Sequence, residues 1–240
     1  NPSVEAILHA LIPFKFVDHT HTDAVVTITN TADGEARISK LFGKKVLVIP
    51  YIMPGFVLAQ LIYKMTREVN WSELEGMVLL NHGLFTFSDD AKASYEKTIE
   101  LVDKAEKYLK EQGTDLDLLQ SRPDISLLKI ATLRKEVSAL KGCATITKLS
   151  QTPLSVTFAS SDLQHTATQG PLTPDHVIRT KRLPALLEND YKEELASYTT
   201  SYVNYFNDNR NKEICLNSAP NFAILKDIGT FSFGKNIKEA

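Results

Sequence analysis

Residues 76–87 read Gly-Met-Val-Leu-Leu-Asn-His-Gly-Leu-Phe-Thr-Phe, which is an apolar core strand interrupted by a polar pair. The run up to Leu80 is apolar throughout, and the β pattern resumes at Leu84. Such short apolar runs are typical of buried strands. Asn81 and His82 therefore lie where the chain turns between two core strands. His82 alone is more often a turn histidine than a ligand.

Helical and extended patterns alternate on both sides of this stretch, which predicts an α/β protein. The helical patterns cover residues 3–11, 54–68, 89–111, 114–140 (broken by Pro123) and 191–206. The extended patterns cover residues 14–17, 24–29, 46–49, 76–80, 84–87 and 154–159.

The composition is that of an ordinary soluble globular protein, with 43% hydrophobic and 23% charged residues. A formal charge of −2 gives no general attraction to nucleic acid or to an anionic membrane. Cys143 and Cys215 form no cysteine-rich metal motif, which favours a reducing cytoplasm. We expect no transmembrane helix and no signal peptide. Because no Met precedes the first helix, we also expect an N-terminal part of its domain to be missing.

The polar run from Asp18 to Asp23 contains the pair His19 and His21. In an extended chain, residues two positions apart point to the same side, so the two imidazoles would project together. A third imidazole from His82 would complete a set of three, which leaves a coordination position open for substrate or water, as in catalytic metal sites. Alone, a His-x-His pair is more often a solvated pair at a strand end, and Glu5 is an ordinary carboxylate in a first helical turn.

Three motifs taken together resemble the class II aldolase and adducin family. They are Pro-Ser-Val-Glu at residues 2–5, Asp-His-Thr-His-Thr-Asp-Ala-Val at 18–25 and Leu-Leu-Asn-His-Gly-Leu-Phe-Thr-Phe at 79–87. The resemblance implies a three-layer α/β/α sandwich around a mainly antiparallel central sheet. It assigns residues 1–141 to a metal-binding domain of class II aldolase type.

The same resemblance implies roles for five residues. His19, His21 and His82 would be ligands of a divalent metal ion, for which we expect Zn²⁺. Glu5 would be the acid/base residue, and Ser3 would contribute to binding the substrate phosphate. The family's other phosphate-binding segments lie upstream of Asn1, and its members tend to form tetramers.

The C-terminal half, from Thr173 to Pro184 and from Gly229 to Gly234, resembles the aldolase portion of bifunctional rhamnulose-1-phosphate aldolase and short-chain dehydrogenase proteins. No glycine-rich dinucleotide motif is visible, so any dehydrogenase domain would lie beyond Ala240. The basic run from Arg179 to Arg182 is expected to be solvated or to face another subunit.

Residues 142–240 are expected to form a C-terminal part that packs on the first domain as a degenerate second copy. A shift of 146 positions places His19-Thr20 on His165-Thr166, and Gly83, Phe85 and Phe87 on Gly229, Phe231 and Phe233. Under the same shift, His21 falls on Ala167 and His82 on Ile228, so this copy would lack metal ligands.

Three functions remain open from the sequence. The first is metal-dependent cleavage of a ketose 1-phosphate, such as rhamnulose 1-phosphate, to dihydroxyacetone phosphate and an aldehyde. The second is a pentulose-phosphate 4-epimerase, which uses related chemistry. The third is a non-catalytic, adducin-like scaffold, against which the presence of all three histidines and Glu5 argues.

Overall fold

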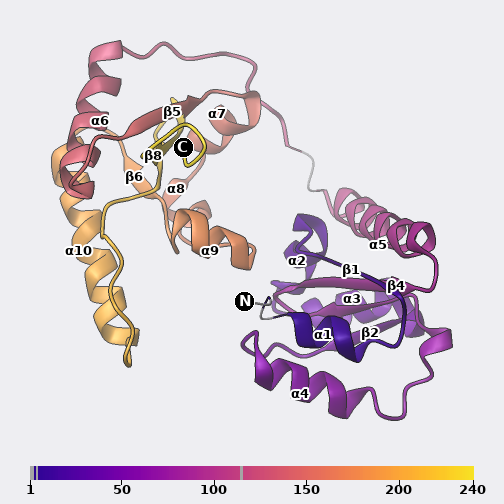
Figure 1. Ribbon diagram of the computed structural model, residues 1–240. Helices are drawn as coiled ribbons and strands as arrows, with labels where there is room; N and C mark the ends of the chain where they lie inside the picture. The colour runs from indigo at the N-terminus through magenta and orange to yellow at the C-terminus, as the bar shows by residue number, and fades with distance from the viewer. Residues whose placement is uncertain (1–2, 4, 114–115) are drawn as a thin grey trace. The chain divides into compact units, whose positions relative to one another are not determined.

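The computed structural model describes residues 3, 5–113 and 116–240. It divides into two compact units (Figure 1). The first unit comprises Asn1–Asp115 with Leu172–Pro174, and the second comprises Leu116–Pro171 with Asp175–Ala240. Pro2, Val4 and Thr114, on which parts of the sequence predictions fall, lie outside the described residues. No helix in the described part of the chain is long and apolar enough to span a membrane.

The first unit is built on a four-stranded mixed sheet with the order β1-β4-β3-β2. β4 is antiparallel to both of its neighbours, whereas β2 and β3 are parallel. The sheet is therefore mainly antiparallel, as expected. Its strands are β1 Phe16–Thr20, β2 Val46–Ile49, β3 Gly76–Leu79 and β4 Gly83–Ser88.

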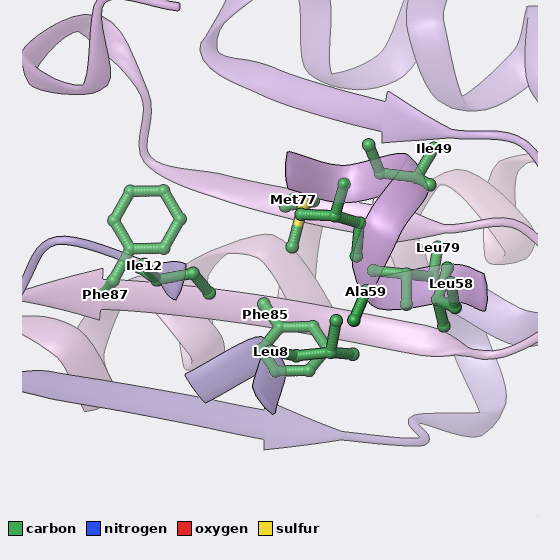
Figure 2. Close-up of a cluster of buried hydrophobic side chains, with 10 residues drawn as sticks. Leu8, Ile12, Ile49, Leu58, Ala59, Met77, Leu79, Phe85 and Phe87 are labelled. Atoms are coloured by element: carbon green, nitrogen blue, oxygen red, sulfur yellow. The ribbon is translucent and has the colours of Figure 1, made fainter. Parts of the chain in front are cut away.

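Helices cover both faces of this sheet. Buried side chains of α1 and α4 pack against one face, in the cluster that Figure 2 shows. Side chains of α2, α3 and α5 pack against the other face. The three-layer α/β/α sandwich is confirmed. Its helices are α1 Ala6–Leu11, α2 Asp23–Thr29, α3 Gly34–Phe42, α4 Phe56–Met65 and α5 Ala91–Glu111, with short 3₁₀ turns η1 Gly43–Lys45 and η2 Trp71–Glu73.

Burial on both faces explains why residues 76–87 are apolar almost throughout. In β4, Phe85 and Phe87 point into the cluster with α1 and α4, whereas Leu84 points to the opposite cluster. β3 alternates in the same way, because Val78 lies in the cluster opposite Met77. The two strands that flank the polar turn thus lie between two cores.

One strand predicted in the first unit is wrong: residues 24–29 form most of the helix α2. Their β-branched residues favour a strand by propensity. However, the Thr22 hydroxyl accepts a hydrogen bond from the Val25 amide (3.2 Å) and caps a helix start. Val25 and Ile28 are then buried, with exposed fractions of 0% and 1%. The N-cap and the packing outweigh the strand propensity.

The second unit repeats this arrangement, with a four-stranded sheet of order β5-β8-β7-β6. Again the outer pair β6 and β7 is parallel and the other pairs are antiparallel. α6 and α10 pack against one face, and α7 and α8 contribute to a smaller cluster on the other. The elements are α6 Leu127–Lys141, β5 Ile146–Ser150, α7 Pro153–Ala159, α8 Leu163–Thr166, α9 Pro174–Thr180, β6 Ala185–Leu187, α10 Tyr191–Asn209, β7 Phe222–Leu225 and β8 Gly229–Gly234.

The structure differs from the sequence predictions at several places in the second unit. The expected strand over 154–159 is the helix α7, which Thr152 caps and Pro153 opens. α6 belongs to the second unit, since Leu133 and Val137 are buried in its core, so the units divide near residue 115 rather than 141. His165-Thr166 lies in α8, not in a strand that corresponds to β1.

Part of the basic run is buried, contrary to expectation. Lys181 has an exposed fraction of only 7% and adopts a left-handed backbone with φ of 67°. Its Nζ donates hydrogen bonds to the carbonyls of Asn217 and Ala219. Burial lowers the pKa of Lys181 to about 8. Lys181 therefore helps to tie the 217–219 segment to the second unit.

Candidate metal centre

Four side chains from distant parts of the first unit converge at one end of its sheet. His19 lies near the end of β1, His21 follows that strand, His82 lies in the turn between β3 and β4, and Glu5 directly precedes α1. One nitrogen or oxygen atom from each of the four lies within 4.8 Å of all the others. The structure therefore brings together all three predicted ligands and the predicted acid/base residue.

The Glu5 carboxylate lies at the centre of this cluster. Its Oε1 is 3.1 Å from His19 Nε2, 3.0 Å from His82 Nε2 and 3.7 Å from His21 Nε2. The Nε2 atoms of His19 and His21 are themselves 3.0 Å apart. The same nitrogen of each ring thus faces one small region of space.

The orientation of His19 is fixed from behind. Its Nδ1 lies 2.9 Å from the Leu84 carbonyl oxygen, which can only accept, so Nδ1 must carry the proton. The His19 ring also stacks on Phe85, with centroids 3.9 Å apart and planes at 13°. In the neutral ring, Nε2 then presents a lone pair to the cluster. A backbone hydrogen bond of this kind is typical of metal-binding histidines.

The electrostatics of the cluster favour an ionised carboxylate beside a neutral imidazole. Burial lowers the pKa of His19 to about 4, although the negative charge of Glu5 opposes this shift. Burial alone would raise the pKa of Glu5, but His19, His82 and His21 together hold it below its ordinary value. At neutral pH, lone pairs of His19 and Glu5 therefore face each other at 3.1 Å.

Such a juxtaposition of acceptors is unfavourable unless a proton or a cation lies between them. Imidazole nitrogens with one carboxylate oxygen are a donor set that suits borderline divalent ions. The residues therefore fit a divalent metal ion, which His19, His21 and His82 would hold, with Glu5 within reach of it.

Gly83 permits the close approach of the two histidine-bearing segments. A Cβ at this position would lie 2.6 Å from the Thr20 carbonyl oxygen, 2.9 Å from His21 Cδ2 and 3.0 Å from His19 Cε1. The first distance is shorter than real Cβ contacts, and its partner is rigid backbone. The glycine is thus required by packing at the start of β4.

Ser3 lies beside the site, but its observed contact is local. It is exposed, and its Oγ accepts a hydrogen bond from the Glu5 amide at 3.2 Å. This bond fixes the backbone that carries the Glu5 carboxylate. Phosphate binding by Ser3 stays a prediction.

Among the described residues of both units, the His/Glu group of the first unit is the one cluster whose atoms lie close enough together to hold a metal ion. The described part of the second unit therefore offers no equivalent ligand set. At the turn between β7 and β8, Ile228 occupies the place that His82 has between β3 and β4. This turn is therefore apolar at the position where its counterpart carries His82.

Two sequence families, each matching one half, together cover nearly the whole chain. The one described as "Class II Aldolase and Adducin N-terminal domain" matches residues 1–109, which include all four clustered residues. The one described as "Aldolase class II, second domain" matches residues 126–240. The chain belongs to the class II aldolase and adducin family. Class II aldolases depend on a divalent metal, in agreement with the donor set of the cluster.

One bacterial protein and two solved structures are among those similar to this chain. "Uncharacterized oxidoreductase YuxG" of Bacillus subtilis (strain 168) is 27% identical over 98% of this chain, which spans only 37% of that protein. The structure of an N-terminal class II aldolase domain from Thermoplasma acidophilum is 44% identical, with a TM-score of 0.40, over 45% of this chain and 48% of that one. A sugar-phosphate aldolase from Thermotoga maritima is 18% identical, with a TM-score of 0.40, over 49% of this chain and 57% of that one.

The cluster should make the metal-free first unit sensitive to acid. Because the pKa of His19 is about 4 in the folded unit and 6.5 ordinarily, the unfolded chain binds the proton more readily. The contribution of neutral His19 to the free energy of unfolding is fully present above about pH 6.5 and is lost as the pH falls toward 4. Glu5 acts in the same direction, since its lowered pKa makes the folded unit lose stability as the carboxylate becomes protonated.

For protein freed of metal with a chelator, we therefore expect the unfolding temperature to fall as the pH is lowered from 6.5 to 4. Fluorescence of Trp71, the single tryptophan, reports on this unit because its ring lies 5.4 Å from that of Phe87. His19→Asn should reduce the pH dependence, whereas His165→Asn in the second unit should not. If the unfolding temperature of His19→Asn depended on pH as steeply as that of the natural protein, His19 would not be the source of this pH dependence.

Proposed function

We propose that this protein is a metal-dependent lyase of class II aldolase type that cleaves a ketose 1-phosphate. The products would be dihydroxyacetone phosphate and an aldehyde, and rhamnulose 1-phosphate is the substrate that we favour. The observation that supports this most is the approach of the Glu5 carboxylate to His19 and His82, at 3.1 and 3.0 Å, in a cluster that fits a divalent ion.

Cleavage breaks a carbon–carbon bond and leaves its electron pair on the dihydroxyacetone phosphate half, as an enediolate. When bound, a divalent cation supplies positive charge where the carbonyl oxygen of the substrate becomes negative. As the aldehyde forms, the substrate hydroxyl next to the breaking bond loses its proton. The ionised Glu5 would gain a proton and deliver it to the carbon of the enediolate, and in the reverse direction remove it from that carbon. Its lowered pKa keeps the carboxylate in the ionised form that abstracts a proton.

The chain's own residues prepare this step in two ways. The Leu84 carbonyl and Phe85 hold the His19 ring so that Nε2 faces the reaction space. The Ser3 hydroxyl holds the Glu5 amide, so that the carboxylate projects from a fixed backbone. In this proposal Ser3 also contributes to binding the substrate phosphate.

Several finer features belong to the same proposal. Zn²⁺ is the metal that we favour, because neutral imidazoles suit it, although cobalt, manganese and nickel also bind such sites. The protein would lie in the cytoplasm, which the free thiols of Cys143 and Cys215 support. It would form a homotetramer, as members of the family tend to do. The second unit would be a ligand-less copy of the first, which its identical strand order supports. A dehydrogenase portion would accompany both units in the full protein.

The test combines metal analysis with product analysis on the purified chain. We expect about one divalent ion per chain after zinc supplementation, and release of dihydroxyacetone phosphate from rhamnulose 1-phosphate that a chelator abolishes. Epimerisation of a pentulose phosphate without net cleavage would instead identify an epimerase. Absence of bound metal after supplementation, with thermal stability unchanged by chelation, would identify a scaffold and contradict the proposal.

A further inference from the structure

The residue before the buried ligand His82 has an unusual backbone. Asn81 adopts a φ of 57°, in the left-handed region that residues other than glycine seldom enter. His82 follows directly and is only 2% exposed. The conformation of Asn81 therefore sets the direction in which the chain, and with it the His82 ring, enters the metal centre.

Hydrogen bonds to the end of α2 hold this conformation. The backbone amide of Asn81 donates a hydrogen bond to Thr29 Oγ1 at 3.1 Å, and the side-chain Nδ2 of Asn81 donates one to Asn30 Oδ1 at 2.6 Å. Nδ2 also lies 3.4 Å from the Thr29 carbonyl oxygen. The Thr29 hydroxyl in turn donates to the Val26 carbonyl at 3.2 Å, so its lone pair is directed at Asn81. We call Thr29, Asn30 and Asn81 the turn clamp.

The other end of α2 adjoins a second ligand. Its N-cap, Thr22, immediately follows His21, and the helix ends at Thr29 after two turns. α2 is packed on the sheet through Val25 and Ile28, which are almost fully buried. The helix therefore links the segment that carries His21 to the turn that carries His82.

The ligand-less unit has the same turn without the same clamp. Asp227, between β7 and β8, has a φ of 59°, close to that of Asn81. Its amide donates to the Ala159 carbonyl at the end of α7, at 3.0 Å. The left-handed turn and its bond to the preceding helix thus belong to the scaffold. The threonine hydroxyl and the two asparagine side chains are found where the turn carries a ligand.

We propose that Asn81 and Thr29 are positioning residues for the metal centre. The turn clamp and α2 together hold His82 at a fixed distance from His21, so that both imidazoles face the metal before it binds. This inference rests on the proposed metal-dependent function. Residues that orient ligands in this way typically alter metal affinity by about 10- to 100-fold when they are removed.

Two variants break the turn clamp with little effect on the backbone. Thr29→Val removes the hydroxyl but keeps the shape of the buried side chain. Asn81→Gly removes the amide side chain, and glycine adopts the left-handed conformation without strain. We expect both to bind Zn²⁺ about 10- to 100-fold more weakly, in competition with a chromophoric chelator. Thr29→Ser, which keeps the hydroxyl, should retain the affinity of the natural protein.

The cobalt spectrum separates positioning from general stability. In the Co²⁺-loaded protein, we expect the visible absorption bands of Thr29→Val and Asn81→Gly to shift, because the ligands are reoriented. Asp227→Gly, the matched change in the second unit, should leave both the affinity and the spectrum unchanged. Trp71 fluorescence establishes that the first unit of each metal-free variant is folded.

The outcomes distinguish this inference from the function on which it rests. If the natural protein binds neither Zn²⁺ nor Co²⁺, the proposed function fails and the positioning role fails with it. If the natural protein binds metal, and folded Thr29→Val and Asn81→Gly bind it with unchanged affinity and spectrum, only the positioning role is overturned. An equal loss of affinity in Asp227→Gly would also overturn it, since the effect would then not depend on the turn clamp.

Discussion

Replacing His82 with glutamine should remove stoichiometric metal binding and, with it, carbon–carbon bond cleavage. His82 is buried, and its Nε2 lies 3.0 Å from the Glu5 carboxylate. Glutamine fills a similar volume but offers a weak neutral amide in place of an imidazole nitrogen. Since loss of a residue that only orients a ligand costs about 10- to 100-fold in affinity, loss of the ligand should cost at least about 100-fold.

Metal content by elemental analysis and competition with a chelator would measure this effect. His165→Gln provides the control, because that histidine lies in α8 of the second unit, outside the ligand cluster. Trp71 fluorescence would show that the first unit of His82→Gln remains folded. A folded His82→Gln variant with one tightly bound ion per chain would contradict the assignment of His82 as a ligand.

His82 is a better choice for this test than the other two histidines. His19 also donates to the Leu84 carbonyl and stacks on Phe85, so its replacement disturbs the packing of β4 as well as the metal centre. His21 directly precedes the N-cap of α2, so its replacement could alter the start of that helix. A change at His82 leaves both of these interactions in place.

The sequence, read together with the family resemblance, predicts the His/Glu cluster better than the elements around it. The same-side projection of His19 and His21 follows from the geometry of an extended chain, and β1 continues almost to His21. The interruption at Asn81-His82 is visible because it breaks an otherwise apolar run. These signals are local, and they remain valid whatever packs around them.

The helix α2 could not be predicted in the same way, because packing decides its conformation. Its valines, isoleucine and threonines favour a strand, while the single Thr22 cap and burial against the sheet favour a helix. The role of Thr29 is hidden for the same reason, since Asn81 lies far away in the sequence. The partners of His19 and Gly83 likewise come from strand pairing, which the sequence pattern does not specify.

Replacing Glu5 with glutamine should separate metal binding from proton transfer. The three histidines remain, so we expect the metal to be retained, whereas the amide cannot accept the proton that the carboxylate exchanges with carbon. Loss of a general acid/base typically lowers the rate by about 10²- to 10⁴-fold. The fall should appear in kcat at saturating metal. Glu35→Gln, on the exposed face of α3, is the matched control.

Proton exchange tests this role without the full reaction. In heavy water, the natural protein should incorporate deuterium at the reacting carbon of dihydroxyacetone phosphate, because Glu5 removes and returns that proton. Glu5→Gln should lose the exchange while it keeps its metal, because the amide cannot accept the proton and the three histidines remain. Exchange at the natural rate in metal-loaded Glu5→Gln would mean that a group other than Glu5 moves the proton. The Glu5 carboxylate, 3.0 Å from His82, would then contribute only its negative charge to the site.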